Sequence, residues 1–437
     1  MTSLPESATY VVIGAGIHGL STAYHLAELL EGQGRSGSEV VVLDKKRVGA
    51  GASGICCGVV RNFYLSEGMN EIMRRSVAIF EVDPVGFGYH AVGYIAAVPE
   101  QQAGDLERIY QQQRHIGYRS ELVLGEAPAW QHMELVFPDW AGKGVTAVLH
   151  ERQGGWADPI ATLENLAGMA RSLGVRIVEG VEVQGFDVHD SVVSAVQTSQ
   201  GTIACDLVVL GLGPWIGDAW KMLDLPAELE LVRNGETVRK PMFSYWKLRE
   251  GDFFLPDGKH LPDDAPVVHL DLHSPLVSDA DGSVLEPGPW GIYFKPGRQG
   301  GVQGGGVPVE LGPEIEIEPY GPIHPEYGSA GPGFDEEFTS GLAAALGRFQ
   351  GRSADWRCDS HGGVGAFTPD NYPIVDWVLP NVYGILDSNH GFKMLALGQQ
   401  VASDIVRSEA PALAPFRMKR FEQAALHPVS NSPYPWN

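Results

Sequence analysis

Three glycines near the start of the chain have the spacing of a dinucleotide-binding turn. Gly14, Gly16 and Gly19 form G-x-G-x-x-G between the apolar run YVVI and the helical pattern LSTAYHLAELL. The first glycine permits a tight turn, the second lets a pyrophosphate approach the backbone, and the third lets the helix pack closely on the strand. Free N–H groups at the start of the helix can then bind the phosphates. The motif predicts a dinucleotide site, and an ordinary strand–turn–helix is the alternative.

An acidic residue at the end of the next apolar run extends this site. The run EVVVLD ends at Asp44, where a carboxylate can accept hydrogen bonds from the hydroxyls of a ribose. The gap from Gly19 to Asp44 is longer than usual because the polar stretch GQGRSGSE precedes the run. The Gly/Ser-rich segment GAGASG that follows predicts a loop around the cofactor, with a plain surface turn as the alternative.

The composition excludes several classes of function. The chain has 437 residues, of which 44% are hydrophobic and 19% charged, as in globular proteins of two or three domains. A net charge of −23 argues against nucleic acid or an anionic membrane as a partner. The first residues lack the basic start of a signal peptide, and no apolar run approaches the ~20 residues of a membrane span. The four cysteines have no C-x-x-C or zinc spacing, so we expect a cytoplasmic protein without a metal site.

The elements that position the glycine motif alternate between strands and helices at both ends of the chain. The run DLVVL ends in the turn GLGPW, whose Pro214 suits the first turn of a helix. Residues 225–350 instead contain strand-like, aromatic-rich segments between turns, which predict a mainly antiparallel sheet. The chain then returns to a strand, NVYGILDS, and to a loop entering a helix. This order predicts an α/β cofactor domain that a second domain interrupts.

A series of motifs in one order resembles the D-amino-acid-oxidase-type FAD oxidoreductases, in the branch of sarcosine oxidase and dimethylglycine dehydrogenase. The motifs are VVIGAGIHG, VVVLDKK, GASG…GVVRNFY, GVEVQGFDV, DLVVLGLGPW, IYFKPGRQGGVQGG, GAFTPDNYPIVD and SNHGFKMLALGQQVA. The resemblance covers nearly the whole chain. It implies a Rossmann-type FAD-binding domain with an inserted, mainly antiparallel β-sheet domain of α+β type. A nicotinamide enzyme is the alternative, but the return of the chain to the cofactor is typical of flavoproteins.

The resemblance also implies how the chain is divided. We expect residues 1–92, 145–222 and 355–437 to form the discontinuous FAD-binding domain. Residues 93–144 and 223–354 would form the substrate-binding domain.

The resemblance assigns a set of residues to FAD. They are Gly14, Gly16, Ile17, His18, Gly19, Asp44, Lys45, Ser53, Gly54, Val183, Gly213, Trp215, Gly391, Phe392 and Lys393. The last three are expected to begin the final helix, whose N-terminus would stabilise the negative charge of a reduced flavin. The branch more often has Glu than Asp at position 44. Gly363 replaces the cysteine that links flavin covalently in monomeric sarcosine oxidases, so we expect non-covalent FAD.

The same likeness indicates four candidate catalytic residues. Arg61 and Lys393 match two carboxylate binders, one a planar fork and the other a point charge. A lysine at a helix N-terminus is unfavourable against the dipole, which favours an anion near Lys393. Tyr293 matches a tyrosine of the substrate pocket, and Gln303 replaces a lysine associated with oxygen activation. As alternatives, Arg61 would form a surface ion pair, Lys393 would be solvated at the start of a helix, and Tyr293 would belong to the hydrophobic core.

The function implied is that of an FAD-dependent amine or amino-acid oxidase or dehydrogenase. It would oxidise a C–N bond of a secondary or N-methylated amino acid, or a related small amine carboxylate. Hydride would pass to flavin N5, and water would hydrolyse the resulting imine. Dioxygen or another acceptor would take the electrons, and the chain could form a homo-oligomer. The alternatives are a 2-hydroxy-acid oxidase or dehydrogenase, a flavin subunit of a larger electron-transfer complex, and a non-catalytic flavin-binding protein.

Overall fold

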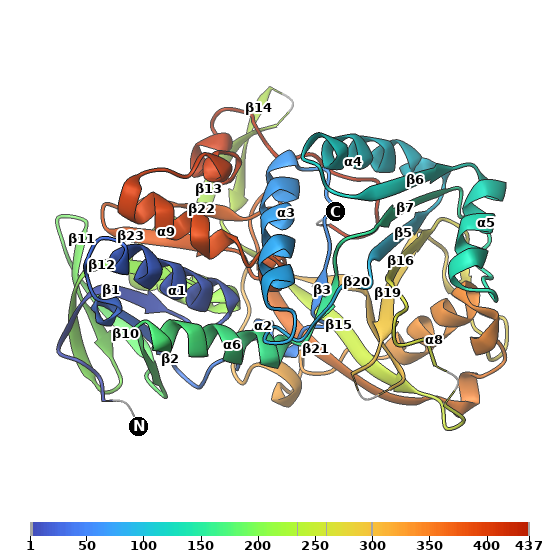
Figure 1. The fold of residues 1–437 in the computed structure, drawn as a ribbon, viewed down its shortest axis with the longest axis horizontal. Coiled ribbons are helices and arrows are strands. Elements are labelled where there is room, and N and C mark those ends of the chain that lie inside the picture. Colours follow the sequence, from blue (N-terminus) through green and yellow to red (C-terminus); the bar gives the residue numbers. More distant parts are fainter. Residues whose placement is uncertain (1–2, 234, 259, 299, 436–437) are drawn as a thin grey trace.

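Two eight-stranded β-sheets lie side by side and form the frame of the molecule (Figure 1). The computed structural model describes residues 3–233, 235–258, 260–298 and 300–435. The first sheet carries the two ends of the chain, and the second is built mainly from its middle. This arrangement confirms the expected α/β fold with a second, mainly antiparallel sheet.

The first sheet has a parallel centre. Strand β1 (Ser7–Ile13) pairs with β2 (Val40–Asp44) on one side and with β12 (Gly201–Leu210) on the other. Their apolar runs are buried, as in parallel strands that helices cover on both faces. The other strands of this sheet are β9 (Arg176–Glu179), β10 (Val183–His189), β11 (Val192–Thr198), β22 (Ile374–Leu379) and β23 (Val382–Leu386).

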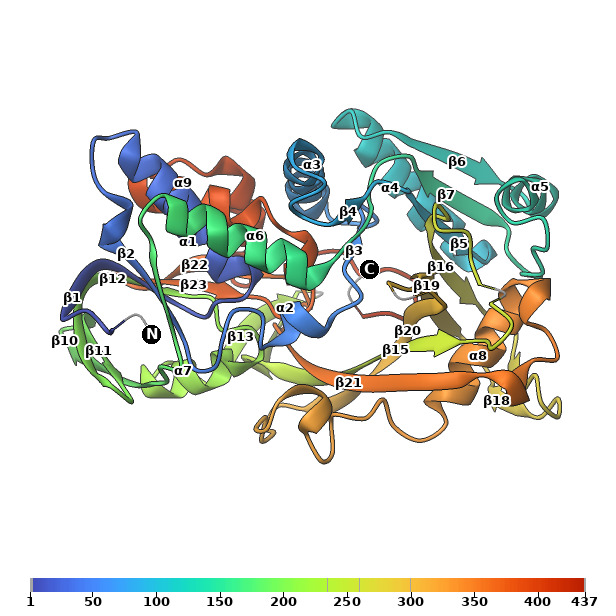
Figure 2. The ribbon, with the colours of Figure 1, turned by 60° about the horizontal axis from the view of Figure 1, so that its bottom comes forward.

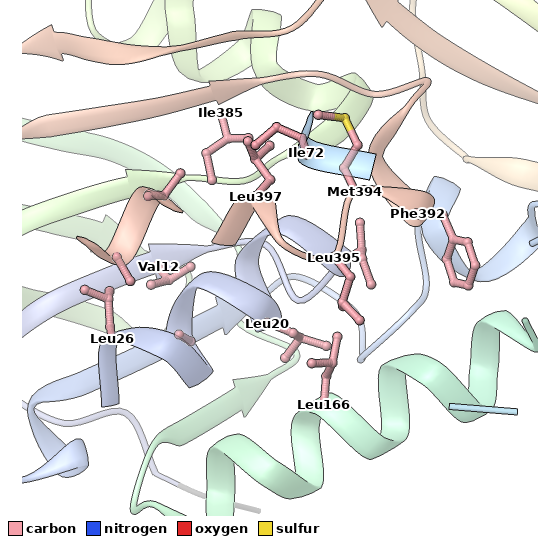
Figure 3. Packing of buried hydrophobic residues seen from close by; sticks show 14 of the residues in the cluster. Val12, Leu20, Leu26, Ile72, Leu166, Ile385, Phe392, Met394, Leu395 and Leu397 are labelled. Atoms are coloured by element: carbon pink, nitrogen blue, oxygen red, sulfur yellow. The ribbon is translucent and has the colours of Figure 1, made fainter. Parts of the chain in front are cut away.

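A hydrophobic core joins the first and last segments of the chain (Figure 3). Helices α1 (Ile17–Glu31), α6 (Pro159–Ser172) and α9 (Leu397–Arg407) contribute to it. Side chains from β1, α1, α6, β23 and α9 meet there, and all of them are buried. A Cβ at Gly398 would collide with the first turns of α1, so this glycine lets α9 approach α1 closely.

The second sheet is antiparallel except where β5 (Tyr94–Val98) pairs with β16 (Val267–Leu272). Helix α4 (Ala103–His115) covers one face, and α5 (Glu126–Val136) and α8 (Phe334–Ala345) cover the other (Figure 2). The other strands are β6 (Ser120–Leu124), β7 (Ala147–Glu151), β15 (Ser244–Phe254), β19 (Trp290–Pro296), β20 (Val302–Gly312) and β21 (Arg357–Phe367).

Two strands belong to a different sheet than the sequence indicated. The predicted boundaries at residues 145 and 355 assigned β7 and β21 to the FAD-binding domain. Both strands instead hydrogen-bond into the second sheet, β7 with β5 and β21 with β15. Hydrophobic alternation identifies a strand but not its partner, so the sequence pattern did not distinguish the two sheets.

Shorter elements connect the sheets. Helix α3 lies between them in Figure 1. Within the described ranges, no helix is long and apolar enough to cross a membrane. The short elements are α2 (Ala52–Ile55), α3 (Glu67–Val82), α7 (Ile216–Met222), the three-stranded sheet β3 (Val59–Val60), β8 (Gly155–Ala157) and β4 (Tyr89–His90), and the hairpins β13 (Glu228–Arg233) with β14 (Glu236–Pro241) and β17 (Leu276–Val277) with β18 (Val284–Glu286).

Candidate active site

The larger pocket lies at the carboxyl ends of the parallel strands. Gly14 follows β1, Asp44 ends β2, Gly211 follows β12, and Ser388 lies just beyond β23, and all four line this cavity of about 1330 Å³. The carboxyl edge of a parallel sheet is where folds of this kind bind nucleotides. The expected cofactor residues therefore meet at one place, with the exceptions described below.

The three glycines of the motif each leave room for a different neighbour. Gly14 has a φ of +105°, and a Cβ there would collide with the carbonyl oxygen of Gly211. A Cβ at Gly19 would collide with the carbonyl oxygen of Gly14, so Gly19 lets α1 pack on the turn and does not itself line the pocket. Gly16 opens onto the pocket, where a Cβ would approach only Ser53 Oγ, at 3.2 Å.

The Gly/Ser-rich segment wraps the start of α1. Ile17 N donates a hydrogen bond to Ser53 Oγ at 3.2 Å, and both residues line the pocket. Gly54 lies outside the pocket, and a Cβ there would collide with the carbonyl oxygen of Gly49. The segment was expected as a loop, but it contains the short helix α2, whose turn positions Ser53.

Asp44 is fixed by two backbone N–H groups. Ala15 N donates to Oδ2 at 2.9 Å, and Lys46 N donates to Oδ1 at 2.8 Å. Burial raises the pKa of Asp44, and these two hydrogen bonds oppose the increase. Each carboxylate oxygen keeps a second lone pair, so the group can still accept a hydrogen bond from a ribose hydroxyl.

The far end of the larger pocket is aromatic and cationic. Lys45 Nζ lies 4.1 Å from the ring centroid of Trp215, and the ring of Tyr320, which does not itself line the pocket, has its centroid 4.7 Å from that of Trp215. Gly213 and Val183 complete the wall. The lining residues of this wall come from the segment after β2, the turn after β12 and the start of β10, and all were expected to bind FAD.

Two buried nitrogen atoms in the larger pocket have no hydrogen-bond partner in the described part of the protein. They are His18 Nδ1 and Trp215 Nε1. Buried polar atoms are normally paired, so these atoms suit a polar ligand. Together with the open backbone at Gly16, they fit a dinucleotide such as FAD.

A buried carboxylate joins the start and the end of the chain behind this pocket. His18 Nε2 lies 3.0 Å from Asp387 Oδ2, and His390 Nδ1 lies 2.9 Å from Asp387 Oδ1. Burial alone would raise the pKa of Asp387, but the flanking His390 and His18 lower it well below its usual range. The ionised carboxylate therefore fixes α1 against the segment that follows β23.

The segment Gly391–Lys393 differs from its prediction. It forms a separate 3₁₀ turn, and α9 begins only at Leu397. The expectation that these residues begin the last helix is wrong, and the dipole argument for an anion near Lys393 does not apply to α9. Gly391 and Phe392 line the larger pocket, whereas Lys393 lines a second, smaller one.

The smaller pocket, of about 740 Å³, shares a wall with the larger pocket. Both cavities are lined by Cys56, Leu248, Asn389 and Phe392. A group bound at this end of the larger pocket would therefore border the smaller one.

Three candidate catalytic residues meet in the smaller pocket: Arg61, Lys393 and Tyr293. Arg61 is 5% exposed, and its Nη1 donates to the carbonyl oxygen of Phe63 at 2.7 Å. Its guanidinium carbon lies 5.7 Å from the ring centroid of Tyr94. Arg61 is too buried to form a surface ion pair. Its guanidinium instead forms a fixed cation in the wall of the pocket.

The fourth candidate, Gln303, lies outside both pockets. Gln303 Oε1 accepts a hydrogen bond from Lys295 Nζ at 2.6 Å, and its Nε2 donates to Asp252 at 3.3 Å. Burial lowers the pKa of Lys295 to about 8. The replacement of a lysine by Gln303 suggested that this position lacks a positive charge. Lys295, on the paired strand β19, instead places its amino group beside Gln303.

Several residues of the smaller pocket were missed in the sequence. Glu250, His269 and Tyr434 line it, and Tyr434 comes from the Pro-rich tail HPVSNSPYPWN. His269 alternates with Asp271 in VVHLDL, a strand that is buried throughout. Polar residues two apart in a buried strand share one face, and this was the signal available. The tail offered none, because its position depends on contacts such as Ser432 Oγ to Asp271 Oδ2 at 2.7 Å.

The cysteines and the potential metal ligands among the described residues form no additional functional site. Gly363 on β21 lies against Ile55 and Tyr320, and Cys358 lines neither pocket. Burial raises the pKa of the Cys56 thiol to about 12, with the charge of Glu250 adding to the effect. In the described stretches, no three His, Cys, Asp or Glu side chains are grouped to hold a metal ion.

The chain is similar in sequence to several oxidoreductases. It is 26% identical to mitochondrial dimethylglycine dehydrogenase of Rattus norvegicus, over 71% of this chain and 34% of that protein. It is 28% identical to sarcosine oxidase subunit beta of Rhizobium meliloti (strain 1021), over 46% of this chain and 48% of that protein. It is also 25% identical to FAD-dependent oxidoreductase domain-containing protein 1 of Bos taurus, over 97% and 87%. The chain thus spans a third to a half of the length of the first two.

Solved structures share the fold. L-proline dehydrogenase from P. horikoshii superposes with a TM-score of 0.75 and 21% identity, covering 97% of this chain and all of that one. Glycine oxidase from Geobacillus kaustophilus superposes with a TM-score of 0.69 and 18% identity, covering 95% and 99%. The family model for FAD dependent oxidoreductases (DAO) matches residues 9–404. The chain is therefore a member of the DAO family of FAD-dependent oxidoreductases.

Proposed function

We propose that the protein oxidises a C–N bond of a secondary or N-methylated amino acid, or of a related small amine carboxylate. The family uses FAD, which supplies the two-electron oxidant when it is bound. The product would be an imine that water hydrolyses. Dimethylglycine dehydrogenase and sarcosine oxidase subunit beta, both similar in sequence, support this substrate class.

The larger pocket would hold FAD. Its phosphates would lie at Gly14, Gly16 and Ile17, and its adenosine end at Asp44 and Trp215. Ser53, which closes over the start of α1, and the segment Gly391–Lys393 would flank its other end. No thiol replaces Gly363, and the thiol of Cys56 stays protonated, so we propose that the FAD is bound non-covalently.

The shared wall of the two pockets is the observation that carries the proposal. A small molecule in the smaller pocket would meet the larger pocket at Cys56, Leu248, Asn389 and Phe392. Oxidation by a bound dinucleotide requires that kind of adjacency, because the reacting atoms must come into contact.

Arg61 and Lys393 would bind the carboxylate of the substrate. Arg61 can offer a planar fork of donors, and Lys393 adds a point charge from the 3₁₀ turn. Tyr293 and the surrounding aromatic rings would exclude water and orient the substrate. The pocket walls come from both sheets, which supports a division into an FAD-binding and a substrate-binding domain.

Anaerobic mixing of the purified holoprotein with a panel of amino acids, N-methyl amines and 2-hydroxy acids tests the proposal. Loss of the flavin absorbance with amino acids that carry a secondary amine is the expected result. Reduction by hydroxy acids alone would instead show a 2-hydroxy-acid dehydrogenase. No reduction by any compound would leave a flavin-binding protein without this activity.

A second possibility is that the chain is a flavin subunit of a larger complex. It is favoured by the likeness to sarcosine oxidase subunit beta, whose name indicates an assembly. Fast reduction by substrate, slow turnover with dioxygen and fast turnover with an artificial acceptor would support it. A monomer or homo-oligomer that turns over rapidly with dioxygen would contradict it.

A further inference from the structure

The smaller pocket is lined by charges of both signs. Arg61 and Lys393 come from the segment after β3 and from the 3₁₀ turn after β23, whereas Glu250 lies on β15 of the second sheet. Arg249 also lines the pocket, but its guanidinium pairs with Glu337 at 2.9 Å and donates to the carbonyl oxygen of Val307 at 2.8 Å. The binding of an anionic substrate group gives a role to Arg61 and Lys393, but it gives none to the carboxylate of Glu250.

Glu250 is held in place by a neutral group. Tyr293 donates its hydroxyl proton to Glu250 Oε1 at 2.5 Å. Gly305 pairs with both residues across the sheet, and a Cβ there would crowd the Tyr293 hydroxyl. The glycine thus leaves room for this hydrogen bond. A phenol satisfies one oxygen but does not neutralise the carboxylate, and no described Lys, Arg or His forms an ion pair with it.

The charge of Glu250 acts on buried neighbours. Burial raises the pKa of Tyr293 well above its usual value, and the charge of Glu250 adds to this increase. Burial and the same charge also raise the pKa of Cys57. A half-buried carboxylate whose direct hydrogen-bond partner is neutral is stabilised by a cation, and the ligand can provide one.

We propose that Glu250 binds the positively charged nitrogen of the substrate, so that the pocket selects compact zwitterions. This inference rests on the proposed function. An amino acid with an ammonium nitrogen would place its carboxylate at Arg61 and Lys393 and its cation at Glu250. A 2-hydroxy acid has the same carboxylate but no cation, and it would leave Glu250 unpaired.

A pair of ligands of the same shape separates charge from size. Trimethylammonioacetate carries a carboxylate and a cation, whereas 3,3-dimethylbutanoate has carbon in place of nitrogen. Their dissociation constants would be measured from the perturbed flavin absorbance of the holoprotein. We expect the wild type to prefer the zwitterion by about tenfold or more. Glu250→Gln should bind the two ligands about equally.

Two further variants control for the loss of structure. Glu310→Gln makes the same change on the exposed part of β20, outside the pocket, and should keep the preference. If Glu250→Gln does not fold, as judged by FAD content and thermal unfolding, Glu250→Met of similar length replaces it, with the same result expected.

The possible outcomes are distinct. An unchanged preference in the Glu250 variants, or equal binding of the two ligands to the wild type, would overturn the inference and leave the proposed function intact. If the wild type binds neither ligand, or binds the carboxamide of 3,3-dimethylbutanoate as well as the acid, then the carboxylate site fails. The inference would fail with it.

Discussion

Arg61 lies over the ring of Tyr64, with its guanidinium carbon 4.6 Å from the ring centroid. The stacked ring and the bond to the carbonyl of Phe63 hold the planar group in one orientation. A guanidinium fixed in this way can meet a carboxylate with two parallel hydrogen bonds. We therefore expect lysine to be a poor replacement at this position.

Arg61→Ala should lower kcat/KM by about 30- to 1,000-fold, equivalent to about 2–4 kcal/mol, because a buried substrate carboxylate loses a charged partner. Arg61→Lys should also be impaired, since a point charge does not replace a planar fork. Steady-state kinetics with the best substrate of the panel measure both effects. The control is the amide of that substrate, which the wild type should reject and Arg61→Ala should reject much less. Equal rejection by both proteins would show that Arg61 does not bind the carboxylate.

Gly16→Val should abolish FAD binding. The new methyl groups would occupy the space that opens onto the larger pocket and would press on Ser53 Oγ. The ratio of flavin to protein absorbance after purification measures the loss. Gly104→Val is the matched control, because a Cβ at Gly104 meets no neighbour within 4 Å. A full complement of FAD in Gly16→Val would show that the motif is only structural.

Acid precipitation should release all the flavin into the supernatant. Gly363 offers no thiol, and Cys56 is held as a neutral thiol that is a poor nucleophile. Absorbance of the supernatant and the intact mass of the pelleted protein measure the outcome. A mass increased by that of FAD would reveal a covalent bond, with Cys56, Cys57 or a histidine as the attachment point.

The cofactor site was more predictable from the sequence than the substrate site. The glycine motif acts through the backbone of neighbouring residues, so its spacing determines its geometry, as at Gly14 and Gly19. The smaller pocket combines Arg61, Glu250 and Tyr434, which lie far apart in the chain. Strand pairing and the placement of the tail bring them together, and neither is encoded in a local pattern.

Similar reasons explain the errors in detail. Lys393 was expected at a helix start, but a 3₁₀ turn separates it from α9. Helix ends are set by capping contacts that hydrophobic periodicity does not report. Gln303 was interpreted without its cross-strand neighbour Lys295, which only the register of β19 and β20 reveals.

The stability of the protein should depend on pH through Glu151. This residue is completely buried and accepts hydrogen bonds from Asn62 N and Gln113 Nε2, both at 2.7 Å. Burial raises the pKa of its carboxyl from 4.5 to about 7. Between these values the folded protein keeps a proton that the unfolded chain releases. The free energy of unfolding therefore falls as the pH rises through this window, by roughly 3 kcal/mol in all.

Glu151→Gln replaces the titrating carboxyl with an amide that binds no proton in this pH range. The variant should gain stability relative to the wild type between about pH 5 and about pH 8, because only the wild type pays for an ionised carboxylate. Urea unfolding of both proteins across this range measures the difference. A difference that stays constant with pH would show that Glu151 does not titrate in this window.

Both pockets are lined by residues from the early and the late parts of the sequence, which affects how the protein folds during synthesis. A ribosome makes Asn389 and Tyr434 more than 300 residues after Gly14 and Arg61, so a shorter nascent chain has no complete pocket. Until β23 emerges, the end of β12 that pairs with it stays open as a sheet edge. We expect the unfinished chain to be prone to aggregation through this edge and to bind its flavin only after Asn389 has been made.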